Sequence, residues 1–368
     1  MKRFISTLII AFLLLLSVVA AEQYTIDFST TPEKITARDN PFAHYDDLGE
    51  LPELAVTVKD SAGQPAKDIS ITVTVTHVDD LILPSGFPWV QGKELFSVTS
   101  YEEDGALTVD GLLFPLRGEY TVDVTVMDWT GNSQKETFTV EAAEPFKQST
   151  WNGIIFVAAL GIFGFIVGLV FGKDLIASKK AQGKMGNILG IFVLLLVIAI
   201  PFTVAHSEDE IGESGIVHYE DSQVLFYTNP EVPDIGAETY FTVEVKDENG
   251  MPVNNAIAQI ELANEEEGFV VLETAIFSQT GTFTFQYGIF DGAPHLATVH
   301  IEATEASSYQ FVPIEREYAF AGEAHNPPFT AKLIATAVML LAMLVGFAAG
   351  VAVRACKKSK CSEGEHHE

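Results

Sequence analysis

The chain has 368 residues, of which 48% are hydrophobic, and yet it carries a formal net charge of −29. High hydrophobicity beside 50 acidic residues indicates that apolar and acidic stretches are segregated along the chain. Glycine accounts for only 28 residues and aromatic residues for 11%, which excludes collagen-like, coiled-coil and disordered chains. A chain this acidic would repel phosphate, so no nucleic-acid partner is expected. Two cysteines are too few for a disulfide-built scaffold.

Residues 1–21 have the pattern of a secretory signal peptide. Lys2 and Arg3 precede an apolar run that ends in the small residues Ala20 and Ala21. An uncleaved anchor helix has the same composition and stays open as an alternative. In either case the residues that follow are expected outside the cytoplasm.

Three further apolar stretches are each long enough to cross the hydrocarbon core of a bilayer, which is about 30 Å thick. We therefore predict transmembrane helices over residues 151–172, 186–205 and 331–353. Lysine and arginine are concentrated in the connecting loop 173–185 and in the tail 354–368. The positive-inside rule places both of these basic segments in the cytoplasm.

The two long segments between these stretches, residues 22–145 and 206–326, are then predicted to be extracytoplasmic, in agreement with the signal peptide. Nearly all of the acidity falls there: residues 22–150 have a net charge of −15 and residues 206–330 a net charge of −21. We interpret the acidity as the solvated surface of exported domains. A field that concentrates cations is the alternative.

Both exported segments have the residue pattern of β-structure. Val and Ile alternate with Thr and charged residues, which predicts half-buried strands with one face inward, as in an antiparallel β-sandwich. The alternation covers residues 54–59, 69–75 and 120–126 in the first segment and 241–245, 256–262, 282–287 and 297–301 in the second.

A repeated motif connects the two segments. Val56-Thr-Val-Lys-Asp-Ser-Ala-Gly63-Gln-Pro65 in the first segment returns in the second as Val243-Glu-Val-Lys-Asp-Glu-Asn-Gly250-Met-Pro252. In each copy a strand ends in Lys-Asp, a polar turn with glycine reverses the chain, and proline fixes φ before the next strand. We interpret the repeat as a tandem duplication, which gives the order sandwich, helix, helix, sandwich, helix.

The strand, turn and Gly-x-Pro pattern resembles bacterial Ig-like domains of the YtkA-like and FixH-like extracytoplasmic group. Phe290-Asp-Gly-Ala-Pro-His295, before the last strands of the second copy, is similar to that group as well. The resemblance covers both exported segments and implies Ig-like sandwiches, with metal-linked or oxidase-linked accessory roles in some members. The first copy departs from it, with Phe114-Pro-Leu-Arg-Gly118-Glu-Tyr120 at the comparable place.

The order of segments also resembles that chain of the methane and ammonia monooxygenases which places two exported β domains around a pair of helices. The resemblance implies a copper site with a His-x-His pair. The sequence contains no His-x-His, which argues against a monooxygenase role.

Histidine is the exported residue type best suited to bind a metal ion. Strand parity places His295 toward the core and His300 on the opposite face, so these two side chains cannot bind one ion together. A site would require His295 to meet His218, His206 or a carboxylate across the fold. His295, His218 and His206 are therefore the candidate copper ligands. The alternative function is that of a copper-handling accessory protein for a membrane enzyme complex.

Calcium is the other candidate ion, because residues 247–250 and 265–267 are rich in carboxylate and amide oxygens. Neither segment has the spacing of an EF-hand loop, and turn geometry or solvation accounts for both. The sequence contains no nucleophile elbow, no metalloprotease helix motif and no phosphate-binding glycine loop. We therefore expect no enzymatic activity and no bound cofactor.

The first and third predicted helices carry no ionisable residue over 153–171 and 333–353, so we expect anchors rather than ion pathways. Small residues recur in both helices at a spacing of four, which predicts close packing on each other or on a partner. These residues are Gly164, Gly168 and Gly172 in the first helix and Ala342, Gly346 and Gly350 in the third.

The sequence as a whole predicts mainly β ectodomains plus α-helical membrane segments. Two Ig-like antiparallel β-sandwiches would lie outside the cell membrane on a multi-pass anchor of three transmembrane helices. The expected role is non-enzymatic binding or assembly. The expected partners are the membrane and an envelope protein, bound through the ectodomains or the glycine-rich helix faces.

Overall fold

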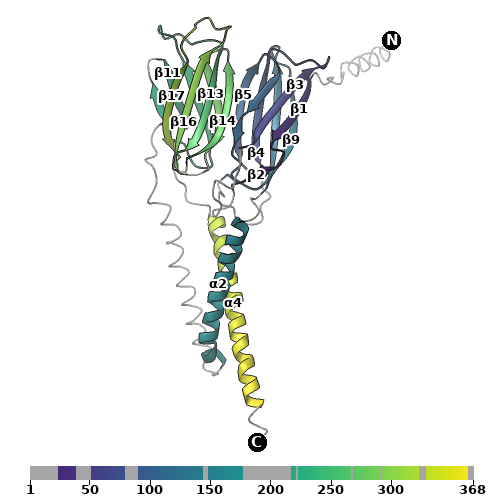
Figure 1. Ribbon diagram of the computed structural model, residues 1–368, viewed down its shortest axis with the longest axis vertical. Helices are drawn as coiled ribbons and strands as arrows, with labels where there is room; N and C mark the ends of the chain where they lie inside the picture. The colour runs from purple at the N-terminus through teal and green to yellow at the C-terminus, as the bar shows by residue number, and fades with distance from the viewer. Residues whose placement is uncertain are drawn as a thin grey trace, which may run out of the picture.

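A computed structural model of the chain describes residues 24–38, 51–78, 90–143, 148–176, 217–220, 223–266, 268–290, 292–322 and 329–363. The predicted signal peptide and the second predicted transmembrane helix, residues 186–205, lie outside the described residues. Two β-rich lobes stand side by side, and two long helices descend beneath them (Figure 1).

Each of the seven predicted strands is present, and most are longer than the alternation alone indicated. The strands of the first copy are β1 (Tyr24–Thr31), β2 (Ile35–Thr36), β3 (Glu53–Asp60), β4 (Ile69–His77), β5 (Glu94–Glu102), β6 (Ala106–Val109), β7 (Gly111–Leu112), β8 (Gly118–Asp128) and β9 (Ser133–Ala143). Those of the second copy are β10 (His218–Glu220), β11 (Val224–Asn229), β12 (Glu238–Val245), β13 (Ala256–Asn264), β14 (Phe269–Ser278), β15 (Thr282–Gly288), β16 (Pro294–Ala303) and β17 (Ile314–Ala321).

The two copies have the same strand topology. In the first copy β3 pairs with β1 and β6, while β4 pairs with β5 and β8, and β8 pairs with β9. In the second copy β12 pairs with β11 and β15, while β13 pairs with β14 and β16, and β16 pairs with β17. Two sheets with a shared apolar core form each copy, which is the Ig-like sandwich architecture.

The first copy is not purely antiparallel, contrary to the prediction. The short strand β2 pairs in parallel with β9, with Ile35 opposite Ala142. Without β2, the last strand of this sheet would leave a row of backbone groups unpaired, and β2 covers part of that edge.

The repeated motif has the same backbone in both copies. Equivalent isolated bridges close the two turns, from Lys59 to Pro65 and from Lys246 to Pro252. The residue that enters the following strand is Asp68 in one copy and Asn255 in the other, and both adopt a left-handed backbone with φ of 55° and 50°. Asp and Asn are the non-glycine residues that best tolerate this region, so both copies carry the residue type that this turn requires.

The sheets continue from one copy into the other. Strand β15 of the second copy pairs with β5 of the first, from Phe285 opposite Val98 to Tyr287 opposite Phe96. In the other layer β14 pairs with β7. One sheet therefore runs β10-β11-β12-β15-β5-β4-β8-β9-β2, and the buried apolar residues of both copies form one contiguous core.

Side chains reinforce this junction between the copies. The backbone N–H of Phe277 donates to the Ser100 hydroxyl at 3.1 Å. The Arg38 guanidinium of the first copy lies over two rings of the second, 4.6 Å from the centroid of Phe269 and 5.4 Å from that of Phe290. The described ectodomain residues thus form one two-layer body, whereas the sequence predicted two sandwiches.

Helix α2 spans Gln148–Ile176 and helix α4 spans Phe329–Glu363. Each contains an apolar stretch that is long enough to cross a membrane, Ile154–Phe171 in α2 and Thr336–Arg354 in α4. Helix α4 continues beyond Arg354 into the segment predicted as a tail. Ala, Lys, Arg and Glu are good helix formers, so the helix does not end where its apolar stretch ends.

The predicted packing of the glycine rows is confirmed. A Cβ atom added at Gly164 would clash with the backbone of Met343, and one added at Gly168 would clash with the backbone of Phe347. The reciprocal contact places Gly350 against Phe165. The two helices therefore approach to backbone contact, which only glycine at these positions allows.

Candidate functional site

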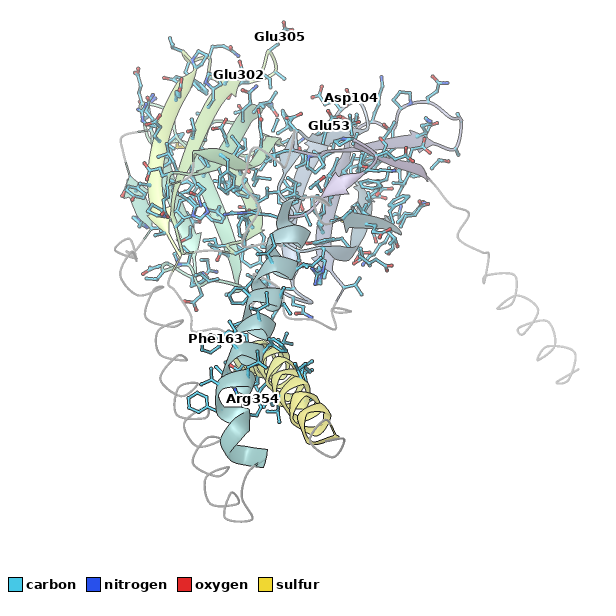
Figure 2. The ribbon with its side chains drawn as sticks, turned by 60° about the horizontal axis from the view of Figure 1, so that its bottom comes forward. Glu53, Asp104, Phe163, Glu302, Glu305 and Arg354 are labelled. Atoms are coloured by element: carbon cyan, nitrogen blue, oxygen red, sulfur yellow. The ribbon has the colours of Figure 1, made fainter. Side chains whose placement is uncertain are left out.

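The strand directions define which end of the sandwiches faces away from the helices. Strands β9 and β17 lead into α2 and α4, so their last residues lie near the helices. Their neighbours β8 and β16 are antiparallel to them, which places the turns after β8 and β16 at the opposite end. We call this opposite end the distal end. Asp104, Glu302 and Glu305 lie there, far from the helix pair (Figure 2).

The most exposed large apolar side chains of the described sandwich residues are at the distal end. Trp129 is 85% exposed, Val312 is 84% exposed and Met251 is 63% exposed. Trp129 lies in the turn between β8 and β9, Met251 in the turn between β12 and β13, and Val312 in the connection between β16 and β17. Exposed aromatic and apolar residues of this kind are typical anchors of protein interfaces.

The turns that carry Trp129 and Met251 are held by carboxylates. The Asp128 carboxylate accepts the backbone N–H groups of Thr130 at 2.8 Å and Asn132 at 2.9 Å. Asp247 accepts the N–H of Met251 at 2.8 Å, and this hydrogen bond is the largest of the effects that lower the pKa of the Asp247 carboxyl. The side chains at these tips are therefore presented on ordered turns, which reduces the entropy lost on binding.

These hydrogen bonds also explain residues 247–250, which the sequence offered as a calcium candidate. One oxygen of Asp247 already accepts two backbone N–H groups of its own turn, from Asn249 and Met251, each at 2.8 Å. Calcium binding at this turn stays a prediction.

Carboxylates from the two copies face each other across the junction. Burial raises the pKa of Glu94 in β5, and the nearby charge of Glu238 in β12 raises it further. Burial likewise raises the pKa of Asp110, next to β7, with Glu273 in β14 adding to the effect. The repulsion between these acids weakens the junction as pH rises.

Glu102, at the distal end of β5, has the largest shift among these acids: burial raises its pKa to about 7, with a smaller contribution from the charge of Asp104. Between the ordinary glutamate value and pH 7 the folded state binds more protons than the unfolded state. Stability therefore falls as pH rises through this window and stays lower above it.

Replacing Glu102 by glutamine is expected to raise the free energy of unfolding by about 1 kcal/mol at pH 8 and by much less at pH 4.5. Unfolding of the full chain in detergent, followed at both pH values, measures the difference. Glu103→Gln is the matched control, because Glu103 is the exposed neighbour in the same segment. An equal gain from Glu102→Gln at both pH values would contradict the assignment.

The predicted metal ligands lie in different environments. His295 is buried, with its ring stacked 5.4 Å from that of Phe320, and its Nδ1 is 2.8 Å from the carbonyl of Ala293. His218 is exposed at the start of β10. His206 lies outside the described residues. Among the described residues, no group of three or more His, Cys, Asp or Glu is placed to hold a metal ion.

The predicted orientation of the histidines is confirmed, whereas the ligand set stays a prediction. His295 points into the core and His300 lies on the opposite face of β16. His77 also faces the core, where its Nδ1 accepts the N–H of Gly92 at 3.1 Å and its Nε2 lies 3.2 Å from the carbonyl of Arg117. Both contacts are satisfied by the neutral ring with its proton on Nε2. His77 is therefore a structural histidine.

The exposed distal residues were not among the sequence predictions. A signal for one of them is present, because Asp128-Trp-Thr-Gly-Asn132 places a tryptophan inside an otherwise polar turn. An apolar side chain that a turn does not require is a candidate contact residue. Val312 and Met251 have no comparable signal, since their exposure depends on the folded connection around them.

No protein-family model matches the chain, and no curated protein matches it. Solved structures that it resembles include invasin, a bacterial integrin-binding protein, at 12% identity and a TM-score of 0.22, with 81% of this chain and 40% of that chain covered. A tetra-tandem repeat from the extending region of a large adhesion protein matches at 9% identity and a TM-score of 0.20, with 82% and 50% covered.

A CARDB domain from Pyrococcus furiosus is a third similar structure, at 17% identity and a TM-score of 0.20, covering 35% of this chain and 96% of that domain. The chain thus spans half or less of the length of invasin and of the adhesion repeat. At this identity the likeness concerns the β-sandwich fold alone, and the fold assignment rests on the strand pairing described above.

Proposed function

We propose that this protein is a membrane-anchored, non-enzymatic binding or assembly protein that presents its distal end to an envelope protein outside the cell. The observation that carries this proposal is the position of Trp129, Met251 and Val312. The most exposed apolar side chains of the described sandwich residues lie in distal turns, opposite the helices.

The helices support the anchoring part of the proposal. Apolar side chains such as Ile155, Phe163 and Leu341 are exposed on the faces that α2 and α4 do not use for each other. Hydrocarbon is the solvent in which an apolar face of this length is stable. Arg354, at the end of the apolar stretch of α4, donates a hydrogen bond to the carbonyl of Leu169 in α2.

The direction of the two helices supports a multi-pass topology. Both α2 and α4 start at the sandwiches and run the same way, as Figure 1 shows. If both sandwiches are outside, the chain must cross back between them, and the apolar stretch 186–205 can supply that crossing. The lysines of residues 173–185 then lie in the cytoplasm, where the positive-inside rule places them.

The charge of the ectodomain indicates the chemistry of the partner. The exported segments are strongly acidic, and Asp104, Glu302 and Glu305 lie at the distal end (Figure 2). A fitting partner has an apolar pocket for an aromatic anchor and a rim of Lys or Arg. Such a complex would form faster at low ionic strength than at high ionic strength.

Sidedness is tested with single cysteines in the full chain. In a background in which Cys356 and Cys361 are serine, Thr130→Cys is expected to react with a membrane-impermeant maleimide in intact cells. Cys356 and Cys361 of the unaltered chain are expected to react only after permeabilisation. Labelling in the reverse order would overturn the topology.

Binding is tested by quantitative co-purification at native expression in mild detergent. Trp129→Ser is expected to lower recovery of the bound envelope protein at least about tenfold, since truncated interface anchors commonly cost about 2 kcal/mol or more. Tyr240→Ser is the matched control, because Tyr240 is an exposed aromatic residue on a sheet face rather than in a distal turn. Purification of the protein alone under all conditions, or equal recovery with both variants, would count against the proposal.

A further inference from the structure

The two helices carry the same short motif. Gly-Phe-x-x-Gly occurs at Gly164–Gly168 in α2 and again at Gly346–Gly350 in α4. Each helix directly follows the sandwich of its own copy. The duplication visible in the strands therefore has a counterpart in the helices.

The contacts between the helices are reciprocal under the shift that carries Gly164 onto Gly346. Gly164 packs on the backbone of Met343, and the shifted pair, Gly346 with Gly161, is also in backbone contact. Gly168 packs on Phe347, and its shifted counterpart places Gly350 on Phe165. A contact that maps onto its own reverse is the signature of a twofold relation between two units.

One helix contact lies on the axis of that relation. Gly168 and Gly350 are equivalent positions, and a Cβ atom added at Gly350 would lie 3.1 Å from the carbonyl carbon of Gly168. Equivalent residues meet each other only on a twofold axis. Since the two helices run the same way, this axis runs along them.

The ectodomain contains a second point on the same kind of axis. Gly105 and Gly281 are equivalent, since each has a left-handed φ (71° and 74°) and each carbonyl accepts the N–H of the matching strand residue, Val58 or Val245. Tyr101 and Phe277 stand at the same distance before these glycines in their two copies. Their rings lie 5.8 Å apart, so equivalent residues again contact each other.

The strand pairing at the junction follows the same rule. β5 corresponds to β14, and the β6–β7 region corresponds to β15, so the β5–β15 ladder has the β14–β7 ladder as its counterpart. The counterpart is displaced in register, because Asp110 interrupts the chain between β6 and β7. Both sheets therefore cross the junction in equivalent ways.

We infer that the duplicated unit is a sandwich together with its own helix, and that this unit binds a second copy of itself through one self-complementary surface. The surface runs from Tyr101 and Phe277 in the sandwiches to Gly168 and Gly350 in the helices. The chain supplies both copies and is a covalent pseudo-homodimer.

Covalent linkage favours this pairing, since it makes the encounter of the two copies intramolecular. A self-complementary surface also forms every contact twice, apart from those on the axis. One axis through sandwiches and helices fixes the distal turns of both copies in the same direction.

Cross-linking of the full chain tests this inference in a background with serine at Cys356 and Cys361. Two pairs of cysteines report on the axis: Tyr101→Cys with Phe277→Cys, and Gly161→Cys with Met343→Cys. The nearest atom to a Cβ added at Gly161 is 3.9 Å away, so this position has room for a side chain. With a short bismaleimide, each pair is expected to give a within-chain product, seen as a mobility shift at the mass of one chain.

The matched control is Phe163→Cys with Val345→Cys. These positions are related by the same shift along the chain, and they are 52% and 62% exposed on the outer faces of the helices. This pair is expected to give no within-chain product. Cross-links between chains in place of within-chain products, or an equal yield from the control pair, would overturn the inference.

Adding Gly164→Leu or Gly346→Leu tests the symmetry itself. Either substitution is expected to abolish the product of the Gly161 and Met343 pair to the same extent, because both glycines make the same contact. The product of the Tyr101 and Phe277 pair is expected to persist, which shows that the sandwiches remain folded. A loss caused by only one of the two leucines would contradict a self-complementary helix surface.

Discussion

Replacing Gly281 by alanine is expected to lower the free energy of unfolding by about 3–5 kcal/mol, whereas the same change at Gly250 is expected to cost only about 1 kcal/mol. Both glycines adopt a left-handed backbone, with φ of 74° and 77°. A Cβ atom at Gly250 would point into open space, whereas one at Gly281 would clash with the backbone of Val253. The difference between the two variants therefore isolates the steric term.

Denaturant unfolding of the full chain in detergent measures both variants. Gly105→Ala extends the experiment to the first copy, because an added Cβ atom there would lie 2.7 Å from the carbonyl oxygens of Val58 and Ala66. A loss similar to that of Gly281→Ala is expected, since the two glycines occupy the same position of the duplicated fold. Equal costs at Gly250 and Gly281 would show that backbone strain alone decides the outcome.

Replacing Phe241 by alanine is expected to cost about 3–5 kcal/mol, the usual range for a buried phenylalanine. Phe241 is fully buried in the second copy. Its ring stacks on Phe285 with centroids 5.0 Å apart and meets Phe320 edge-on at 5.2 Å. The change would remove both ring contacts and leave a cavity between the two sheets.

Tyr240→Ala is the control for this variant, because Tyr240 is the preceding residue and lies on the exposed face of the same strand. It is expected to change stability by less than about 1 kcal/mol. Because the sheets continue across the junction, Phe241→Ala should lower a single unfolding transition of the whole ectodomain. Two separate transitions, with the first copy unaffected, would contradict the continuous fold.

Local sequence determined the strands and the repeated turn. The alternation over 69–75 is the burial pattern of β4, and the Lys-Asp to Gly-x-Pro motif forms the same bridged turn in both copies. Periodicity suffices here because side chains alternate between the two faces of any strand. The same parity correctly placed His77, His295 and His300, and the glycine rows correctly predicted that α2 and α4 pack closely.

Only the tertiary structure decided how the two copies meet. The pairing of β5 with β15 and of β7 with β14 uses backbone N–H and C=O groups, which every residue other than proline carries and no side-chain pattern marks. The exposure of Trp129, Met251 and Val312 was equally invisible, since it depends on which connections the fold leaves at its distal end. Sequence thus determined which face of each strand is buried, because that depends on side chains alone. The choice of neighbour for each strand edge required the complete fold, because edge pairing depends on geometry between residues far apart in the chain.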